Sequence, residues 1–237
     1  MVSHDGMQLE TLTEYDRNDY DIVLAAVTQN GSALEFASPA RKADRSIVLA
    51  AVRTCAKALQ LAGDELKRDR QFIEDAVASN GGTFQYADKA YQDDSCIVRI
   101  AISRFGTNLA FASERCKSDR KIVSEAIENT GMSLKYASPD LKKDKDIVTS
   151  AVKNYGVALA DASPDLQADR EVVLAAVNRD GRALKYASPD LQADREVVLA
   201  AVNQHHESLA YASPDLRDDV QLRSAAAATL VKRYFSG

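Results

Sequence analysis

The chain has 237 residues, of which 46% are hydrophobic and 27% are charged, and its formal net charge is −5. This composition is ordinary for a folded protein and excludes a disordered chain, which has fewer apolar residues and a higher net charge. The negative charge argues against general electrostatic binding to nucleic acid or anionic membranes. No apolar run approaches the roughly 20 residues that a membrane-spanning helix needs, so we expect neither membrane insertion nor secretion.

The sequence repeats every 25 residues from residue 19 onward, without an insertion or a deletion. Residues 1–18 form a predicted N-terminal cap with half of a degenerate repeat. Residues 19–218 hold eight tandem repeats, and residues 219–237 form a predicted C-terminal capping helix. A short, strict period indicates one supersecondary unit stacked many times into a continuous core. An aspartate opens every copy: Asp19, Asp44, Asp69, Asp94, Asp119, Asp144, Asp169, Asp194 and Asp219.

The clearest repeat, residues 169–193, begins with an amphipathic helix. Its apolar residues recur at i, i+1, i+4 and i+5, which places them on one side of a helix. Asp169 stands directly before this segment and is the predicted N-cap, because its carboxylate can accept from free backbone N–H groups. Gly181 is the predicted stop, in the left-handed conformation that closes a last helical turn.

A shorter second helix follows in the same repeat. It carries Leu184 and Tyr186 and ends at Ser188-Pro189, where proline can open a further helical turn. Helices this short are marginal alone in water, so neighbouring repeats must cover their apolar faces. The alanine eight positions into each repeat, such as Ala151, indicates a close approach between helices. The predicted fold is an all-α solenoid of 25-residue two-helix units.

The residue before the position that glycine holds in most repeats reveals a longer period of 50 residues. Odd-numbered repeats have Asn30, Asn80, Thr130 and Asp180, and even-numbered repeats have Cys55, Phe105, Tyr155 and His205. The segment DREVVLAAV at 169–177 and 194–202, with GRALKYASPDL and ESLAYASPDL after it, resembles the tandem repeat called domain of unknown function 4116. The resemblance covers essentially the whole chain from residue 19 and implies a helical repeat. It transfers no catalytic residue, cofactor or ligand to this sequence.

Four residues are candidates for partner contact. Phe105, Tyr155 and His205 could form a partly apolar ridge that grips an extended peptide, because interfaces favour exposed aromatic anchors. The competing interpretation places them on the buried side of the long helix, where they fill space between repeats. Asp161 stands where most short helices carry an aromatic residue, so it is either a site or a local drift to exposure without a nameable partner.

A basic series could follow a phosphate backbone. Its members directly follow the capping aspartates: Arg45, Arg70, Arg120, Lys145, Arg170 and Arg195. Each has an aspartate beside it, so we expect local neutralisation. No companion set of exposed stacking aromatics is evident, which further argues against nucleic-acid binding.

No catalytic or metal-binding motif occurs, and the recurrence of aspartate indicates capping rather than a single carboxylate pair. We therefore predict neither enzymatic activity nor a cofactor. Cys55, Cys96 and Cys116 lack paired metal-type spacing and read as reduced apolar residues, which favours the cytoplasm. The sequence favours a protein-binding or scaffolding repeat, with nucleic-acid binding along the basic series or a purely structural array as alternatives.

Overall fold

The computed structural model describes residues 6–235, and no β-strand occurs among them. Residues 1–5 of the predicted N-terminal cap and residues 236–237 of the predicted capping helix lie outside the described residues. Helices recur with the period of the sequence and pack in sequential order. The predicted fold class, an all-α solenoid-like repeat, is confirmed.

Each repeat contains the two predicted helices and the predicted further turn, which is itself helical. The first is a long α-helix: α2 (Tyr20–Gln29), α4 (Arg45–Thr54), α6 (Arg70–Ser79), α8 (Ser95–Arg104), α10 (Arg120–Asn129), α11 (Lys145–Asn154), α13 (Arg170–Arg179), α15 (Arg195–Gln204) and α17 (Val220–Phe235). The second is a 3-10 helix: η1 (Gly6–Thr11), η2 (Gly31–Phe36), η3 (Ala56–Leu61), η4 (Gly81–Tyr86), η5 (Gly106–Phe111), η6 (Gly131–Tyr136), η8 (Gly156–Asp161), η9 (Gly181–Tyr186) and η10 (His206–Tyr211). The third is one short turn: α1 (Glu14–Asn18), α3 (Pro39–Lys42), α5 (Asp64–Arg68), α7 (Lys89–Gln92), α9 (Glu114–Lys117), η7 (Leu141–Lys143), α12 (Pro164–Gln167), α14 (Pro189–Gln192) and α16 (Pro214–Arg217).

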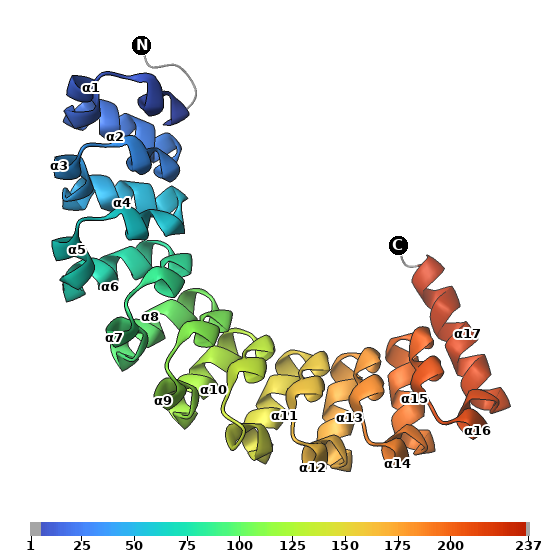
Figure 1. The fold of residues 1–237 in the computed structure, drawn as a ribbon. Helices are drawn as coiled ribbons and strands as arrows, with labels where there is room; N and C mark the ends of the chain where they lie inside the picture. Colours follow the sequence, from blue (N-terminus) through green and yellow to red (C-terminus); the bar gives the residue numbers. More distant parts are fainter. Residues whose placement is uncertain (1–5, 236–237) are drawn as a thin grey trace. The chain divides into compact units, whose positions relative to one another are not determined.

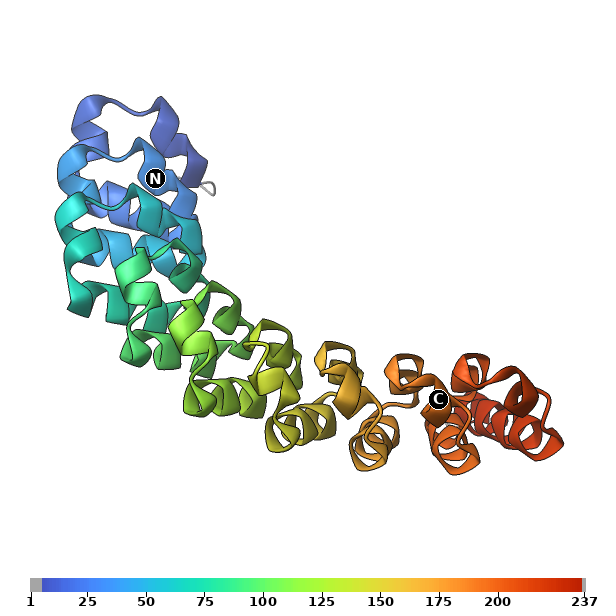
Figure 2. The same ribbon diagram turned by 60° about the horizontal axis from the view of Figure 1, so that its bottom comes forward.

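The chain divides into two compact halves, residues 1–116 and 117–237. Within each half, successive long helices pack against each other, and successive 3-10 helices pack in a second row beside them (Figures 1 and 2). The short helices line one side of the stack, as α1, α3 and α5 do in the N-terminal half (Figure 1). Each repeat therefore completes its core with the repeats before and after it.

The core follows the apolar pattern of the long helix. In α13 the predicted positions i, i+1, i+4 and i+5 are all buried, and the alanine among them, Ala176, has no exposed surface. Leu184 of η9 is likewise fully buried beneath them. The proline-led turns follow the prediction too, since α12 and α14 begin with Pro164 and Pro189.

The recurring glycine has a different role from the predicted one. We expected a left-handed residue, but no positive φ occurs at Gly31, Gly81, Gly131, Gly156 or Gly181. The residue before each glycine takes an extended conformation instead, and the glycine opens the 3-10 helix. Space explains the residue choice: a methyl group on Gly131 would lie 2.3 Å from the carbonyl oxygen of Ala151 in the next long helix. The glycine permits close packing between repeats, and it does not terminate the long helix.

Candidate functional site

An aspartate caps every long helix whose N-cap the structure describes, as the sequence predicted. In α13, Asp169 Oδ1 accepts hydrogen bonds from the backbone N–H groups of Glu171 (3.0 Å) and Val172 (3.2 Å). The same contact recurs at Asp19, Asp44, Asp69, Asp94, Asp119, Asp144, Asp194 and Asp219. These carboxylates satisfy backbone donors that the first helical turn leaves unpaired.

The cation at the first residue of a long helix pairs with the capping aspartate of the next repeat. In the C-terminal half, Arg120 Nε lies 3.1 Å from Asp144 Oδ2, and Lys145 Nζ lies 2.8 Å from Asp169 Oδ2. We call the full series the ladder. Its pairs are Arg45–Asp69, Arg70–Asp94, Arg120–Asp144, Lys145–Asp169, Arg170–Asp194 and Arg195–Asp219.

In the C-terminal half, two ladder cations lower the pKa of their partner carboxylates. The hydrogen bond from Arg120 keeps the pKa of Asp144 below its usual range, although partial burial acts in the opposite direction. Lys145 lowers the pKa of Asp169 in the same way. Several cations also reach a second acidic side chain, as Lys145 does at Glu171, 2.9 Å away. The ladder is thus a series of ion pairs in which the charges of consecutive repeats neutralise each other.

All six residues of the predicted basic series belong to the ladder, so each faces a carboxylate of its own half of the chain. We expected neutralisation by acids nearby in the sequence, and the principal partner instead comes from the following repeat. The signal was present in the period: six of the eight repeats carry a cation at the second position, and an aspartate opens the repeat that follows each of them.

The residue before each glycine lies where the long helix meets its 3-10 helix. Phe105 is 56% exposed and Tyr155 is 37% exposed, so the interpretation that buried these two is wrong. Both have an extended backbone just beyond the last helical residue, and the helical face rule therefore ceases to apply to them. Tyr155 Cβ would lie 2.9 Å from a methyl group on Gly131, so the ring rises directly beside the preceding repeat.

Tyr155 and His205 belong to a polar cluster in the C-terminal half. Between them in sequence, Asp180 forms a 2.7 Å ion pair with Arg182, which lowers the pKa of Asp180 against the effect of burial. His205 Nδ1 lies 3.5 Å from Asp180 Oδ1, too far for an ordinary N–H···O bond of about 2.9 Å. Electrostatic coupling links Arg182 to Tyr155 and to Glu207 as well. The cluster spans three consecutive repeats.

Asp161 lies apart from this cluster, at the other end of η8. Partial burial raises its pKa, while the ammonium groups of Lys142 and Lys135 oppose that rise. Lys142 Nζ itself donates a 2.8 Å hydrogen bond to the carbonyl oxygen of Lys135. Asp161 therefore has cationic neighbours in the preceding repeat, which the sequence could not name.

Two further lysines were missed by the sequence analysis. Lys135 and Lys185 are exposed, and neither forms an ion pair with any described residue. Each ammonium instead lies over the ring of the next residue, 5.9 Å from the Tyr136 centroid and 5.7 Å from the Tyr186 centroid. The dipeptide Lys-Tyr in alternate repeats was the available signal. We call the exposed side of η6, η8, η9 and η10 the 3-10 edge.

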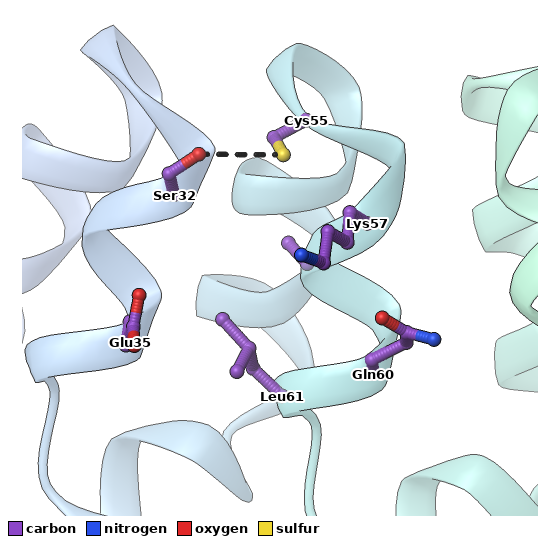
Figure 3. A pocket seen from close by; sticks show the side chains of 7 residues that line it. Ser32, Glu35, Cys55, Lys57, Gln60 and Leu61 are labelled. Carbon is purple, nitrogen blue, oxygen red and sulfur yellow. Dashed lines mark hydrogen bonds between the residues drawn. The ribbon is translucent and has the colours of Figure 1, made fainter.

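In the N-terminal half, a cavity of about 170 Å³ lies between η2 and η3 (Figure 3). Cys55, Ala58 and Leu61 supply apolar lining, and Ser32, Glu35, Lys57 and Gln60 supply polar lining. The Ser32 hydroxyl lies 3.5 Å from Cys55 Sγ across this space. Leu61 stands at the position that holds tyrosine or phenylalanine in most other repeats, so less side-chain volume lies between these two helices.

No group of three or more metal-ligating side chains occurs among the described residues. None of the helices within residues 6–235 is long and apolar enough to cross a membrane.

Comparison with known proteins identifies one family. The family model described as Domain of unknown function (DUF4116) matches residues 1–40, 44–92, 94–142, 119–167 and 169–217. The third and fourth matches begin 25 residues apart (119 − 94 = 25), which is the period of the array. No curated protein and no solved structure matches the chain. Since these matches tile most of its length, the chain belongs to the family of the Domain of unknown function (DUF4116).

Proposed function

We propose that this chain is a non-catalytic helical repeat that binds a partner protein through the 3-10 edge of residues 117–237. The observation that carries the proposal is the exposure of apolar side chains there. Met132 is 49% exposed and Tyr155 is 37% exposed. Met132 lies at the start of η6, and Tyr155 directly precedes η8 in the next repeat. Exposed aromatic and methionine side chains are enriched at protein interfaces.

A non-catalytic role is supported by what the recurring aspartates do. Each caps a helix, and most also form an ion pair with a cation of the preceding repeat. Their carboxylates are therefore engaged in contacts that stabilise the fold. Binding along an extended repeat surface needs no such group.

The alternative function, nucleic-acid binding along the basic series, has less support. The six cations of that series already face carboxylates at 2.8–3.5 Å. Releasing them toward phosphate would leave capping aspartates without their partners, and each phosphate contact would have to offset that loss.

We also propose that the protein works in a reducing compartment, the cytoplasm. All three cysteines are free, and Cys96 is exposed. An exposed thiol persists in the reduced form where thiols are kept reduced. Cell fractionation followed by thiol labelling of Cys96 tests this; recovery in an oxidising compartment with Cys96 blocked would contradict it.

The test of partner binding uses the full chain as bait in a nuclease-treated lysate of its native source, with quantitative mass spectrometry. The wild type should enrich specific proteins, and a Met132→Ser/Tyr155→Ser variant should lose them. A matched control, Tyr15→Ser/Val220→Ser, removes one exposed aromatic and one exposed apolar residue elsewhere, since Tyr15 is 81% and Val220 is 80% exposed. The control should capture the same proteins as the wild type.

Two results would contradict the proposal. Capture that survives in the Met132→Ser/Tyr155→Ser variant would remove the 3-10 edge from the interface. Capture that occurs only in a parallel lysate without nuclease treatment would favour the nucleic-acid alternative.

A further inference from the structure

The 3-10 edge carries a charge pattern unlike that of the ladder. Ladder cations are neutralised across repeats, whereas Lys135 and Lys185 have no carboxylate within ion-pair distance among the described residues. Each of these two lysines is the fifth residue of its 3-10 helix, and each is exposed. The edge therefore presents two exposed positive charges in equivalent positions, and neither forms an ion pair with a described residue.

The spacing of these charges follows from the stacking. η6 packs against η8, and η8 packs against η9, so Lys135 and Lys185 are separated by one intervening helix. Helices that pack directly lie about 8–10 Å apart, which places the two lysines about 16–20 Å from each other. An extended peptide advances about 3.3 Å per residue, so this distance corresponds to about five to six residues.

The repeat between the two lysines has the opposite character. Ala160 replaces the lysine, and Asp161 replaces the tyrosine. Asp161 is half-buried beside Lys142 and Lys135, and its carboxylate would repel an acidic group placed over the middle of the edge. A complementary ligand therefore carries negative charge at its two ends and none between.

We propose that the 3-10 edge of residues 117–237 binds an extended acidic segment of the partner protein, with two carboxylates six residues apart on Lys135 and Lys185. Side chains at i and i+6 of an extended chain point to the same side, so both carboxylates can face the edge. This inference rests on the proposed function and names the chemistry of its partner.

The same pattern disfavours a nucleic-acid strand. Such a strand carries a phosphate at every nucleotide, so it cannot leave its middle uncharged over Asp161. Base stacking also needs open aromatic faces, and the rings of Tyr136 and Tyr186 are covered by their own lysines.

The test measures fluorescence anisotropy of a labelled synthetic peptide with two glutamates six residues apart, titrated with the full chain at low salt. A Lys135→Glu/Lys185→Glu variant should bind at least roughly tenfold more weakly, because two attractions become repulsions. The control variant Lys121→Glu/Lys153→Glu carries the same change in charge at exposed positions of α10 and α11 and should bind within about twofold of the wild type. Thermal melting checks that all variants are folded.

Charge exchange makes the result specific. A peptide with lysines in place of the two glutamates should bind the Lys135→Glu/Lys185→Glu variant better than it binds the wild type. A peptide with adjacent glutamates should bind the wild type more weakly than the spaced one. Asp161→Asn should reduce this discrimination by admitting acidic groups between the ends.

Several outcomes would overturn the inference: no binding of the spaced peptide at millimolar concentration, equal loss in both lysine variants, or failure of the charge exchange. Stronger binding of single-stranded oligothymidylate through the same two lysines would assign the edge to nucleic acid. If lysate capture succeeds while the acidic peptide fails, the proposed function stands and only the partner chemistry is wrong.

Discussion

At the scale of single residues, two small side chains determine how closely repeats stack. Gly31 has its Cα directly against the backbone of the next long helix, where an added methyl group would lie 2.0 Å from the Ala51 carbonyl oxygen. Ala51 is fully buried on the same contact. The recurring glycine and alanine therefore act together, since either one enlarged would force neighbouring repeats apart.

Replacing Gly31 by Ala should destabilise the protein by about 1–3 kcal/mol, because the new methyl group cannot avoid the Ala51 carbonyl oxygen without a backbone shift. Gly82→Ala is the matched control. Its methyl group would meet only the Asn80 side chain at 3.2 Å and Ala56 Cβ at 3.4 Å, so stability should change by no more than about 0.5 kcal/mol. Urea denaturation measures both, and equal effects would refute the close-contact explanation.

Ala151→Leu should cost about 1–3 kcal/mol by overpacking, since Ala151 is completely buried and its carbonyl lies against Gly131. The same substitution at Ala210, which is exposed on η10, should change stability by no more than about 0.5 kcal/mol. Differential scanning calorimetry distinguishes the two. An unchanged melting temperature for Ala151→Leu would show that the array can widen locally without loss.

At the scale of helices, each capping aspartate serves two elements. Asp144 accepts hydrogen bonds from the backbone of its own helix, α11. It also forms an ion pair with Arg120, the first residue of α10. Helix capping and inter-repeat contact thus depend on one ionised carboxylate. Protonation of that group weakens both interactions at once.

Acid should therefore destabilise the stack through the ladder. Since the pKa values of Asp144 and Asp169 are lowered in the folded protein, their stabilising contribution is complete above the ordinary aspartate pKa of about 3.9 and is lost as the pH falls through the folded values. An Arg120→Gln/Lys145→Gln variant should lose less melting temperature than the wild type between neutral pH and pH ~3. Circular dichroism at a series of pH values measures the slope.

The control for this experiment is Lys121→Gln/Lys153→Gln, which removes the same charge from the long helices outside the ladder. It should keep the acid sensitivity of the wild type. If both variants lose sensitivity equally, net charge and not the ladder causes the acid effect.

Local rules predicted the elements better than they predicted the contacts between them. Asp169 as a cap and Pro189 as the opening of a turn follow from the preferences of single residues, and both are present. The role predicted for Gly181 was wrong. A side chain is excluded there by the Ala201 carbonyl oxygen, which is 20 residues away in the sequence and therefore outside any local pattern. Phe105 was ambiguous for a related reason: its direction depends on where the helix ends.

The candidate site shows the same division. Tyr155 could be singled out because it belongs to a series that recurs every 50 residues, and Asp161 because it breaks the aromatic pattern of its position. The recurring Lys-Tyr dipeptide marks Lys135 and Lys185 in the sequence, but only the structure shows that they lie outside the ladder, each over its own tyrosine ring. Electrostatic partners one repeat away are a property of the stack.

At the scale of the whole molecule, stability should follow the number of repeats. Deleting residues 169–218, two complete repeats, joins residue 168 to Asp219, so Lys145 can meet Asp219 where it now meets Asp169. The shortened chain should remain folded and helical with a lower melting temperature, because one-dimensional arrays lose nearest-neighbour interfaces in steps.

A deletion of residues 169–206 provides the out-of-phase comparison. It joins residue 168 to Glu207, the second residue of η10, and places no aspartate at the next cap. This chain should melt at a lower temperature than the in-phase deletion although it retains more residues. The reverse order, measured by circular dichroism, would contradict the nearest-neighbour description.

The ladder also constrains how the length of such a chain can change in evolution. Its pairs join residues 24 positions apart, as Lys145 and Asp169 are, so a copying error that adds or removes a single residue between two partners changes the spacing of the pair that spans it. Recombination that duplicates or discards a complete repeat leaves all remaining pairs in place. Tyr155 and Lys185 take no part in the ladder, and mutation can alter them without changing the length of the repeat. Offspring of one ancestral array would then differ in copy number and in edge residues while sharing one fixed spacing.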